Sequence, residues 1–384
     1  MSFEFLRPIS QELVESITSL HKATLGKKVM LYSEGNFPDL SNVKIAIVGV
    51  IEDRRSVKSE KIPFNYDYIR KQLYKLYEGN WNEQIADLGD IYPGETVEDT
   101  YFLLKSVTED LVNRSILPII LGGSQDLVYA QYRAYDNYGQ MVNLVNVDAQ
   151  FDLGDTEQAL CNKSYVGKMV VNEPYNLFNY ANIGYQTYFN AQEEINLIDK
   201  LFFEAYRLGV ISNDISLAEP VMRDANLVTL DVTSVAVASV NPAMPNGFTG
   251  KEICALARYA GISDKVSSFG LYEIQDLDLT ENSAMLAAQI IWYFIEGVNF
   301  RKKEYNNSFL RDFTKFTVPI EDEYLIFYRS ELSGRWWVEI PNSESFNNKL
   351  NKQSLLPCSH QDYLDACNQI IPERWFKAYR KNQI

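Results

Sequence analysis

Three segments of this sequence place carboxylates directly after apolar, strand-like runs. They are residues 121–126 (LGGSQD), 147–152 (VDAQFD) and 229–233 (TLDVT). In open α/β sheets, ligands and active sites lie beyond the carboxyl ends of the strands. Carboxylates gathered there cannot all stay ionised in a low-dielectric pocket without compensation. Either a cation binds, or a Lys or Arg side chain enters, or a pKa rises.

Histidines are missing from all three segments. The chain has only two, His21 and His360, and neither lies near the acidic clusters in the sequence. Histidines interleaved with carboxylates would make a transition-metal site that lowers the pKa of a bridging water. Oxygen ligands alone make at best a site for a hard cation such as magnesium, calcium or manganese. The residue types therefore indicate the layout of a metal hydrolase in which much of the metal chemistry is gone.

The elements that must position these segments alternate between strand and helix patterns. Runs typical of buried strands occupy residues 43–51, 84–90, 115–123, 141–147, 227–232 and 265–271. Apolar residues recur at helical spacing over residues 9–22, 66–77, 96–112, 192–208 and 281–300. Such alternation predicts an α/β fold with a doubly wound, mostly parallel sheet.

The pattern changes after about residue 303, and we expect two parts: an α/β domain over residues 1–305 and an appended α+β module over residues 306–384. Residues 323–328 and 335–340 flank a turn that contains Gly334. A glycine there can adopt a left-handed conformation, so the pattern predicts a β-hairpin.

Two further signals lie in this C-terminal part. Ser359, three residues before Asp362, resembles a capping box that opens a terminal helix. Trp336 and Trp337 are consecutive in a predicted strand, so their rings should point to opposite faces. We expect one ring to face the core and the other to face solvent or a partner.

Composition excludes several classes of protein. With 384 residues, of which 46% are hydrophobic, the chain can bury a sizeable core. Its net charge of −15 argues against nucleic acid and anionic membranes as partners. No apolar stretch reaches the roughly 20 residues that span a bilayer, and the first residues lack the pattern of a signal peptide. We therefore expect a cytoplasmic protein without membrane insertion.

The chain resembles the ureohydrolase family, which includes arginase, agmatinase and formimidoylglutamase. Matching stretches follow the family's order over about residues 40–300: 86–90 (ADLGD), 120–123 (ILGG), 147–152 (VDAQFD), 230–232 (LDV) and 269–274 (FGLYEI). The resemblance implies a three-layer α/β sandwich with a binuclear manganese centre at the strand ends. It also implies a homo-oligomer and a bacterial source.

The same resemblance implies that half of the metal ligands are substituted. Gln125 stands where the family's Gly-Gly-Asp-His has its histidine, and Gln150 stands where Asp-Ala-His-x-Asp has its histidine. Thr233 replaces the second aspartate of Asp-x-Asp. A glutamine amide has a weakly basic oxygen and an NH2 group that only donates. These substitutions make tight binuclear manganese binding unfavourable.

Four carboxylates of the family pattern are retained as Asp148, Asp152, Asp231 and Glu273. The three aspartates are either a residual cation site or vestigial groups hydrogen-bonded to strand-end amides, to the substituted glutamines or to a basic side chain. Glu273 corresponds to the family's substrate-orienting glutamate. It either recognises a cationic or amidino group or makes a structural hydrogen bond.

Two hypotheses about function follow. The first is a pseudoenzyme, a scaffold or ligand-binding protein without a metal cofactor, which acts through a protein partner or as a homo-oligomer. The second is a divergent hydrolase of a formimidoyl, guanidino or amide C–N bond. It would use one manganese or magnesium ion on Asp148, Asp152 and Asp231, with Glu273 orienting the substrate. We favour the first, because three substitutions affect the same metal site.

Overall fold

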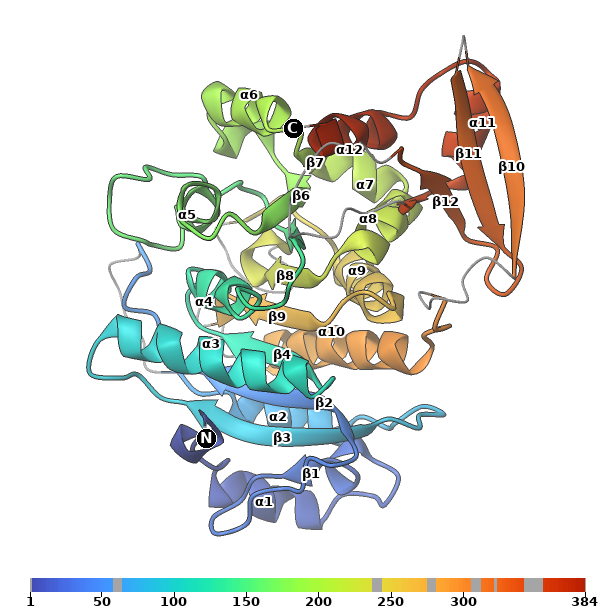
Figure 1. Cartoon of the computed structure of the whole chain (residues 1–384). Helices are drawn as coiled ribbons and strands as arrows, with labels where there is room; N and C mark the ends of the chain where they lie inside the picture. The colour runs from blue at the N-terminus through green and yellow to red at the C-terminus, as the bar shows by residue number, and fades with distance from the viewer. Residues whose placement is uncertain are drawn as a thin grey trace.

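The computed structural model describes residues 2–57, 64–236, 244–274, 281–304, 312–320, 323–341 and 355–383. Its centre is a nine-stranded sheet in the order β1-β3-β2-β4-β9-β8-β5-β6-β7 (Figure 1). Every neighbouring pair in this sheet is parallel. The strands are β1 (Met30–Leu31), β2 (Val43–Val50), β3 (Gln84–Ile91), β4 (Leu117–Gly122), β5 (Val142–Val147), β6 (Leu177–Tyr185), β7 (Glu204–Arg207), β8 (Leu227–Asp231) and β9 (Ser268–Tyr272).

Helices cover both faces of this sheet and make a three-layer sandwich. One core cluster includes residues of α1 (Gln11–Thr18), α2 (Asp67–Lys75), α7 (Leu208–Asn213), α8 (Ala218–Asp224), α9 (Gly250–Ile262) and α10 (Glu281–Asn299). The other includes residues of α3 (Val97–Asn113), α4 (Leu127–Arg133), α5 (Tyr165–Val171) and α6 (Gln192–Lys200). In β2, Ile45 and Ile47 belong to the first cluster and Ala46 and Val48 to the second. This alternation confirms a strand buried on both faces, as parallel sheets require.

The predicted helix over residues 192–208 is wrong in its second half. α6 ends at Lys200, Phe202 adopts a left-handed conformation with φ 55°, and the chain continues as β7. Strand β6 was not predicted, because Asn179 and Asn182 interrupt its apolar run. Both asparagines are buried, and they donate to Glu204 Oε1 and to the Gln150 carbonyl, respectively.

The C-terminal part forms a separate four-stranded antiparallel sheet. Its strands, in the order β10-β11-β12-β13, are β10 (Phe313–Ile320), β11 (Glu323–Ser330), β12 (Trp336–Glu339) and β13 (Leu355–Cys358). The predicted hairpin is confirmed as β11 and β12, with Gly334 at φ 72°. Helices α11 (His360–Cys367) and α12 (Glu373–Gln383) follow. The predicted boundary between residues 305 and 306 lies outside the described residues.

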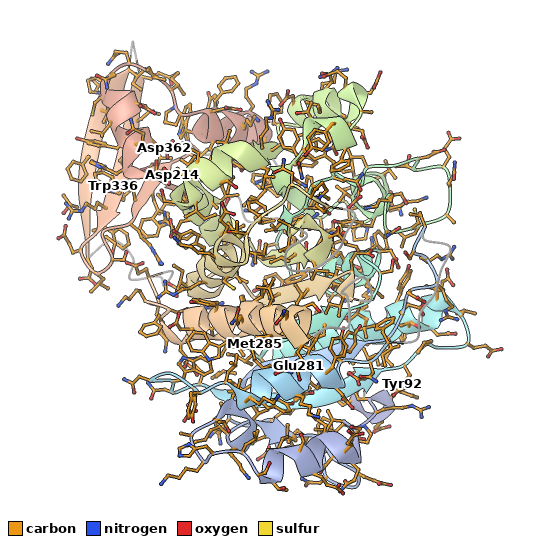
Figure 2. The ribbon with its side chains drawn as sticks, turned by 180° about the vertical axis from the view of Figure 1, so that it is seen from behind. Tyr92, Asp214, Glu281, Met285, Trp336 and Asp362 are labelled. Atoms are coloured by element: carbon orange, nitrogen blue, oxygen red, sulfur yellow. The ribbon has the colours of Figure 1, made fainter. Side chains whose placement is uncertain are left out.

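The C-terminal sheet packs against the α/β domain. Figure 2 labels Trp336 of β12 and Asp362 of α11 within this C-terminal part. The Trp336 ring stacks on Tyr363 of α11 at 4.8 Å. The Trp337 ring lies beneath the Arg223 guanidinium of α8, at 4.3 Å. Both rings are therefore buried, and the expectation that one would face solvent or a partner is wrong. The α/β domain covers the second face of the sheet.

Buried charges hold this contact together. Arg223 donates to the carbonyl oxygens of Trp336 and Cys358, each at 3.0 Å. Arg374 of α12 lies 2.7 Å from Glu204 of β7. Burial alone would raise the pKa of Glu204, but Arg374 and other nearby donors lower it to about 2. The carboxylate therefore stays ionised, and this ion pair attaches the C-terminal helix to the edge of the main sheet.

Among the described residues, no helix is both long and apolar enough to cross a membrane.

The Arg374–Glu204 pair generates a prediction about stability. Arg374→Met should lower the free energy of unfolding by about 3–5 kcal/mol, because it leaves a buried carboxylate without its cation. The double variant Arg374→Met/Glu204→Gln should recover much of this loss, since no unpaired charge remains. Urea unfolding at pH 7 measures both. The exposed Arg380 of the same helix provides a matched control, Arg380→Met, with an expected loss below about 1 kcal/mol. Equal losses in the single and double variants would contradict the ion-pair account.

Candidate functional site

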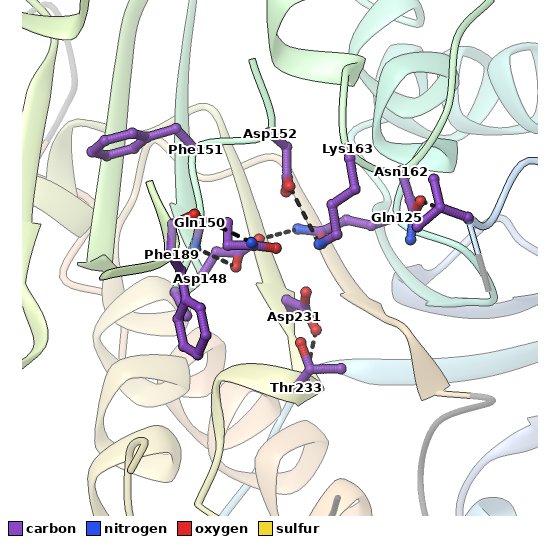
Figure 3. Close-up of polar contacts among 12 residues, drawn as sticks. Gln125, Asp148, Gln150, Phe151, Asp152, Asn162, Lys163, Phe189, Asp231 and Thr233 are labelled. Carbon is purple, nitrogen blue, oxygen red and sulfur yellow. Dashed lines mark hydrogen bonds and ion pairs between the residues drawn. The ribbon is translucent and has the colours of Figure 1, made fainter. Parts of the chain in front are cut away.

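The acidic segments meet at the carboxyl ends of four neighbouring strands. Gln125 follows β4, Glu273 follows β9, Asp231 ends β8 and Asp148 follows β5. These strands are consecutive in the sheet order β4-β9-β8-β5, so their ends lie side by side. The structure thus brings the predicted site residues together, as the close-up in Figure 3 shows.

Asp148 is surrounded by hydrogen-bond donors. The Gln125 side chain donates from Nε2 to Asp148 Oδ2 at 3.0 Å, and Asn146 Nδ2 donates to the same oxygen at 3.2 Å. The Gln150 backbone N–H donates to Oδ1 at 2.9 Å. Gln125 Nε2 also lies 3.2 Å from Asn146 Oδ1 and 3.0 Å from the Tyr165 hydroxyl. The NH2 end of Gln125 therefore faces three acceptors, the oxygens of Asp148, Asn146 and Tyr165.

The three residues that the family resemblance places at metal-ligand positions all act as hydrogen-bond donors. Gln125 uses its side chain on Asp148 and its backbone N–H on Glu273 Oε1, at 2.9 Å. Gln150 uses its backbone N–H, while its side chain lies 3.4 Å from the Phe189 carbonyl. Thr233 donates its backbone N–H to Asp231 Oδ1 at 2.7 Å. N–H groups of the protein therefore donate hydrogen bonds to the carboxylate oxygens of this site.

Lys163 supplies a positive charge to the group. Its Nζ lies 3.3 Å from Asp152 Oδ1, and the Asp152 side chain is 1% exposed, against 37% for Lys163. Burial opposes the charge of Lys163, but the carboxylates of Asp152, Asp148, Asp231 and Glu273 raise the pKa of Lys163. The lysine therefore remains protonated and connects the buried carboxylates to the surface.

The aspartates themselves respond to burial. Burial raises the pKa of Asp152 well above its usual range, although Lys163 acts in the opposite direction. Burial, followed by the charges of Asp148 and Glu273, raises the pKa of Asp231 well above its usual range. A cluster of buried carboxylates can be stabilised by a bound cation, by a Lys or Arg side chain, or by raised pKa values. The described residues show the second and the third: Lys163 pairs with Asp152, and the pKa values of Asp152 and Asp231 are raised.

Glu273 and Asp152 have strained backbones. Their φ angles are 57° and 52°, in the left-handed region that non-glycine residues rarely adopt. Such strain costs on the order of 1–3 kcal/mol and is concentrated at functional sites. Glu273 Oε1 also accepts from Asn162 Nδ2 at 2.9 Å. The fold thus holds the backbones of both residues in a conformation that non-glycine residues rarely adopt.

Sequence reasoning missed Asn146, Asn162, Lys163 and Tyr165. Asn146 interrupts an apolar strand, a signal that could have marked it as a buried polar group. Lys163 is the only basic residue between Asp152 and α5, a weaker signal in a polar loop. Nothing in the spacing of Asn162 or Tyr165 identifies either one.

Asp126, the last residue of the first acidic segment, points elsewhere. It is fully buried, and its carboxylate accepts from the Tyr101 hydroxyl of α3. Burial raises the pKa of Asp126 to about 7, although hydrogen bonds from Ser124 and Tyr101 lower it. Asp126 is therefore a buried carboxyl with a proton to exchange near neutral pH.

The residues present do not fit a binuclear metal centre. Within the described ranges, no group of three His, Cys, Asp or Glu side chains is arranged to hold a metal ion. The amide NH2 of Gln125 faces Asp148 and the ammonium of Lys163 faces Asp152, so donor hydrogens point at oxygens that a metal would need. Four oxygens of the site are buried without a hydrogen-bond partner among the described residues: Asp152 Oδ1, which faces only the Lys163 ammonium, Asp152 Oδ2, Asp231 Oδ2 and Gln125 Oε1.

Comparison with known proteins places this geometry in context. Residues 43–296 match the model of the arginase family. The formimidoylglutamase of Staphylococcus aureus (strain JH9) is 24% identical over 251 residues, which cover 60% of this chain and 78% of the relative. The crystal structure of Trypanosoma cruzi formiminoglutamase with Mn2+2 is similar with a TM-score of 0.60 and 16% identity, covering 69% of this chain and 97% of that one. Bacillus subtilis formimidoylglutamase gives a TM-score of 0.60 and 17% identity, with 71% and 97% covered.

The raised pKa of Asp126 predicts a dependence of stability on pH. Below about pH 4 this carboxyl is protonated in both the folded and the unfolded state. As the pH rises from 4 to 7, the unfolded chain releases the proton while the folded protein keeps it, so the stability falls. Asp126→Asn removes this effect. The stability of the variant relative to the wild type should therefore increase between pH 4 and pH 8, by about 1.4 kcal/mol per unit of pKa shift.

Urea unfolding at pH 4, 6 and 8 measures this difference. Asp155→Asn, at an exposed position, is the control and should show a small, flat difference. A flat difference for Asp126→Asn as well would show that Asp126 is not protonated in the folded protein.

Proposed function

Because the chain belongs to the arginase family, we propose that it is a non-catalytic member that keeps the fold and acts as a scaffold or ligand-binding protein. In this proposal the carboxylates at the strand ends are stable without the manganese centre of the family. No residue is assigned a catalytic role, and Glu273 is a vestigial substrate-orienting group.

The observation that carries the proposal is the set of donors around the carboxylates. Asp148 accepts from Gln125 and Asp152 pairs with Lys163, at 3.0 and 3.3 Å. An amide NH2 group and an ammonium have no lone pair to give to a metal. They supply to the carboxylates the positive charge density that metal ions supply in a metal-dependent hydrolase.

The lack of histidine at the site supports the same conclusion. His360 stacks on Trp336 in the C-terminal part, and His21 lies beside Tyr77 near the amino terminus. Two-metal hydrolysis needs ligands that fix both ions and lower the pKa of a bridging water. The residues around Asp148 and Asp231 supply amides and a lysine in place of imidazoles.

We also propose that a partner, another protein or a second copy of the chain, binds through the C-terminal part. Tyr324, Ile370 and Ile371 are 68%, 58% and 44% exposed. The neighbouring Gln369 side chain donates to the Pro319 carbonyl of β10 at 2.9 Å, and Pro319 is the register partner of Tyr324. These apolar side chains thus lie near one end of the small sheet.

Four free cysteines support the expected cytoplasmic location.

One observation favours a second candidate, a hydrolase of a non-peptide C–N bond that uses a single cation. Asp152 Oδ2 and Asp231 Oδ2 are buried carboxylate oxygens with no hydrogen-bond partner among the described residues. A single manganese or magnesium ion could bind them together with Asp148. This candidate requires divalent-dependent turnover that Asp148→Ala abolishes.

Metal content tests the proposal. The purified protein is incubated with excess manganese, passed through a desalting column and measured by elemental analysis. We expect no stoichiometric manganese, and no hydrolysis of formimidoylglutamate, agmatine or arginine. About two ions per chain would overturn the proposal. About one ion, with turnover that Asp148→Ala removes, would establish the single-cation hydrolase instead.

A further inference from the structure

We propose that the Lys163 ammonium is the resident cation of the strand-end carboxylates, and that a divalent cation binds Asp148, Asp152 and Asp231 only when this ammonium is removed. The inference rests on the proposed function, since it explains how the buried carboxylates remain stable without metal. In this inference, the ammonium of Lys163 neutralises negative charge on the buried carboxylates, as metal ions do in a metal-dependent hydrolase.

The backbone of Lys163 is held close to Asp152. The Val166 N–H donates to the Asp152 carbonyl at 3.2 Å, which closes the loop between them. Gly154, at φ 45°, packs directly against Lys163 on the opposite side of this loop. A Cβ atom at position 154 would come within 2.4 Å of the Lys163 carbonyl oxygen. A side chain at position 154 would therefore push Lys163 away. The lysine is part of a closely packed loop, and its position beside Asp152 is set by the fold.

Asn162 fixes the direction in which Lys163 leaves the loop. Its side chain is buried, donating to Glu273 Oε1 at 2.9 Å and accepting from the Val57 N–H at 3.1 Å. With Asn162 held from both sides, the next side chain extends into the carboxylate group, as Figure 3 shows for Lys163 and Asp152. The consecutive residues Asn162 and Lys163 thus contact two different carboxylates, those of Glu273 and Asp152.

Lys163 has no substitute among the described residues. It is the one cationic side chain there within ion-pair distance of Asp148, Asp152 or Asp231. Without it, these buried carboxylates would keep only neutral donors, so either a cation binds or their pKa values rise further. Because its side chain is 37% exposed, the ammonium lies between the carboxylates and solvent. Removing it opens a set of oxygen ligands suited to a hard cation.

Thermal unfolding of Lys163→Met tests this directly, because methionine keeps the length and packing of the side chain but not the charge. In the wild type, manganese chloride should not change the melting temperature relative to sodium chloride at equal ionic strength. In Lys163→Met it should raise the melting temperature by about 2–4 °C. Elemental analysis should find about one manganese ion per chain in this variant. Lys163→Arg keeps the charge and should behave as the wild type.

Lys168→Met is the matched control, since Lys168 lies in α5 and donates to the Thr156 carbonyl at 2.6 Å. It should show no response to manganese. If Lys163→Met fails to fold, it is refolded from urea with manganese, ethylammonium or sodium chloride. Recovery with the first two but not with sodium chloride supports the proposal, and equal failure in all three overturns it.

A folded Lys163→Met that binds no manganese would also overturn this inference, while leaving the proposed function intact. Stoichiometric manganese binding by the wild type would overturn both this inference and the proposed function. The two failures are therefore distinguishable.

Discussion

Burial of carboxylates at the ends of four parallel strands is the constraint on which the site depends. Asp148, Asp152 and Asp231 are nearly inaccessible to solvent, so each needs a compensating partner. A metal-dependent relative can meet this need with cations. This chain meets it with side-chain amides, strand-end N–H groups and the ammonium of Lys163. In our proposal, the substitutions that the family resemblance implies at Gln125, Gln150 and Thr233 and the observed donor network belong to one electrostatic solution.

The same physical rule governs the C-terminal part. Arg223 and Arg374 are both largely buried, and each has carboxylate or carbonyl oxygens within hydrogen-bond distance. A sheet of four strands buries little apolar area alone and needs a surface to cover its second face. The α/β domain supplies that surface through α8, while β7 pairs with the C-terminal helix α12. The strand-end carboxylates and the exposed apolar side chains of the C-terminal part therefore lie on different elements.

Local signals predicted many elements well. The capping box at Ser359 is confirmed, because a side chain that accepts from the first turn is a local interaction. Strand β6 and the β7 half of a predicted helix were missed, because Asn179 and Glu204 are stabilised by each other and by Arg374 of α12. Contacts between residues that are far apart in the sequence produce no regular spacing of apolar residues, so the sequence pattern does not predict them. Lys163 was missed for the same reason, since only the folded loop brings it to Asp152.

Anomalous X-ray diffraction at the manganese edge, from crystals grown in excess manganese, tests the central claim most directly. The account predicts no anomalous peak at the strand ends, with Lys163 Nζ within ion-pair distance of Asp152 as found here at 3.3 Å. Two peaks between Asp148 and Asp231, with Lys163 displaced, would contradict it.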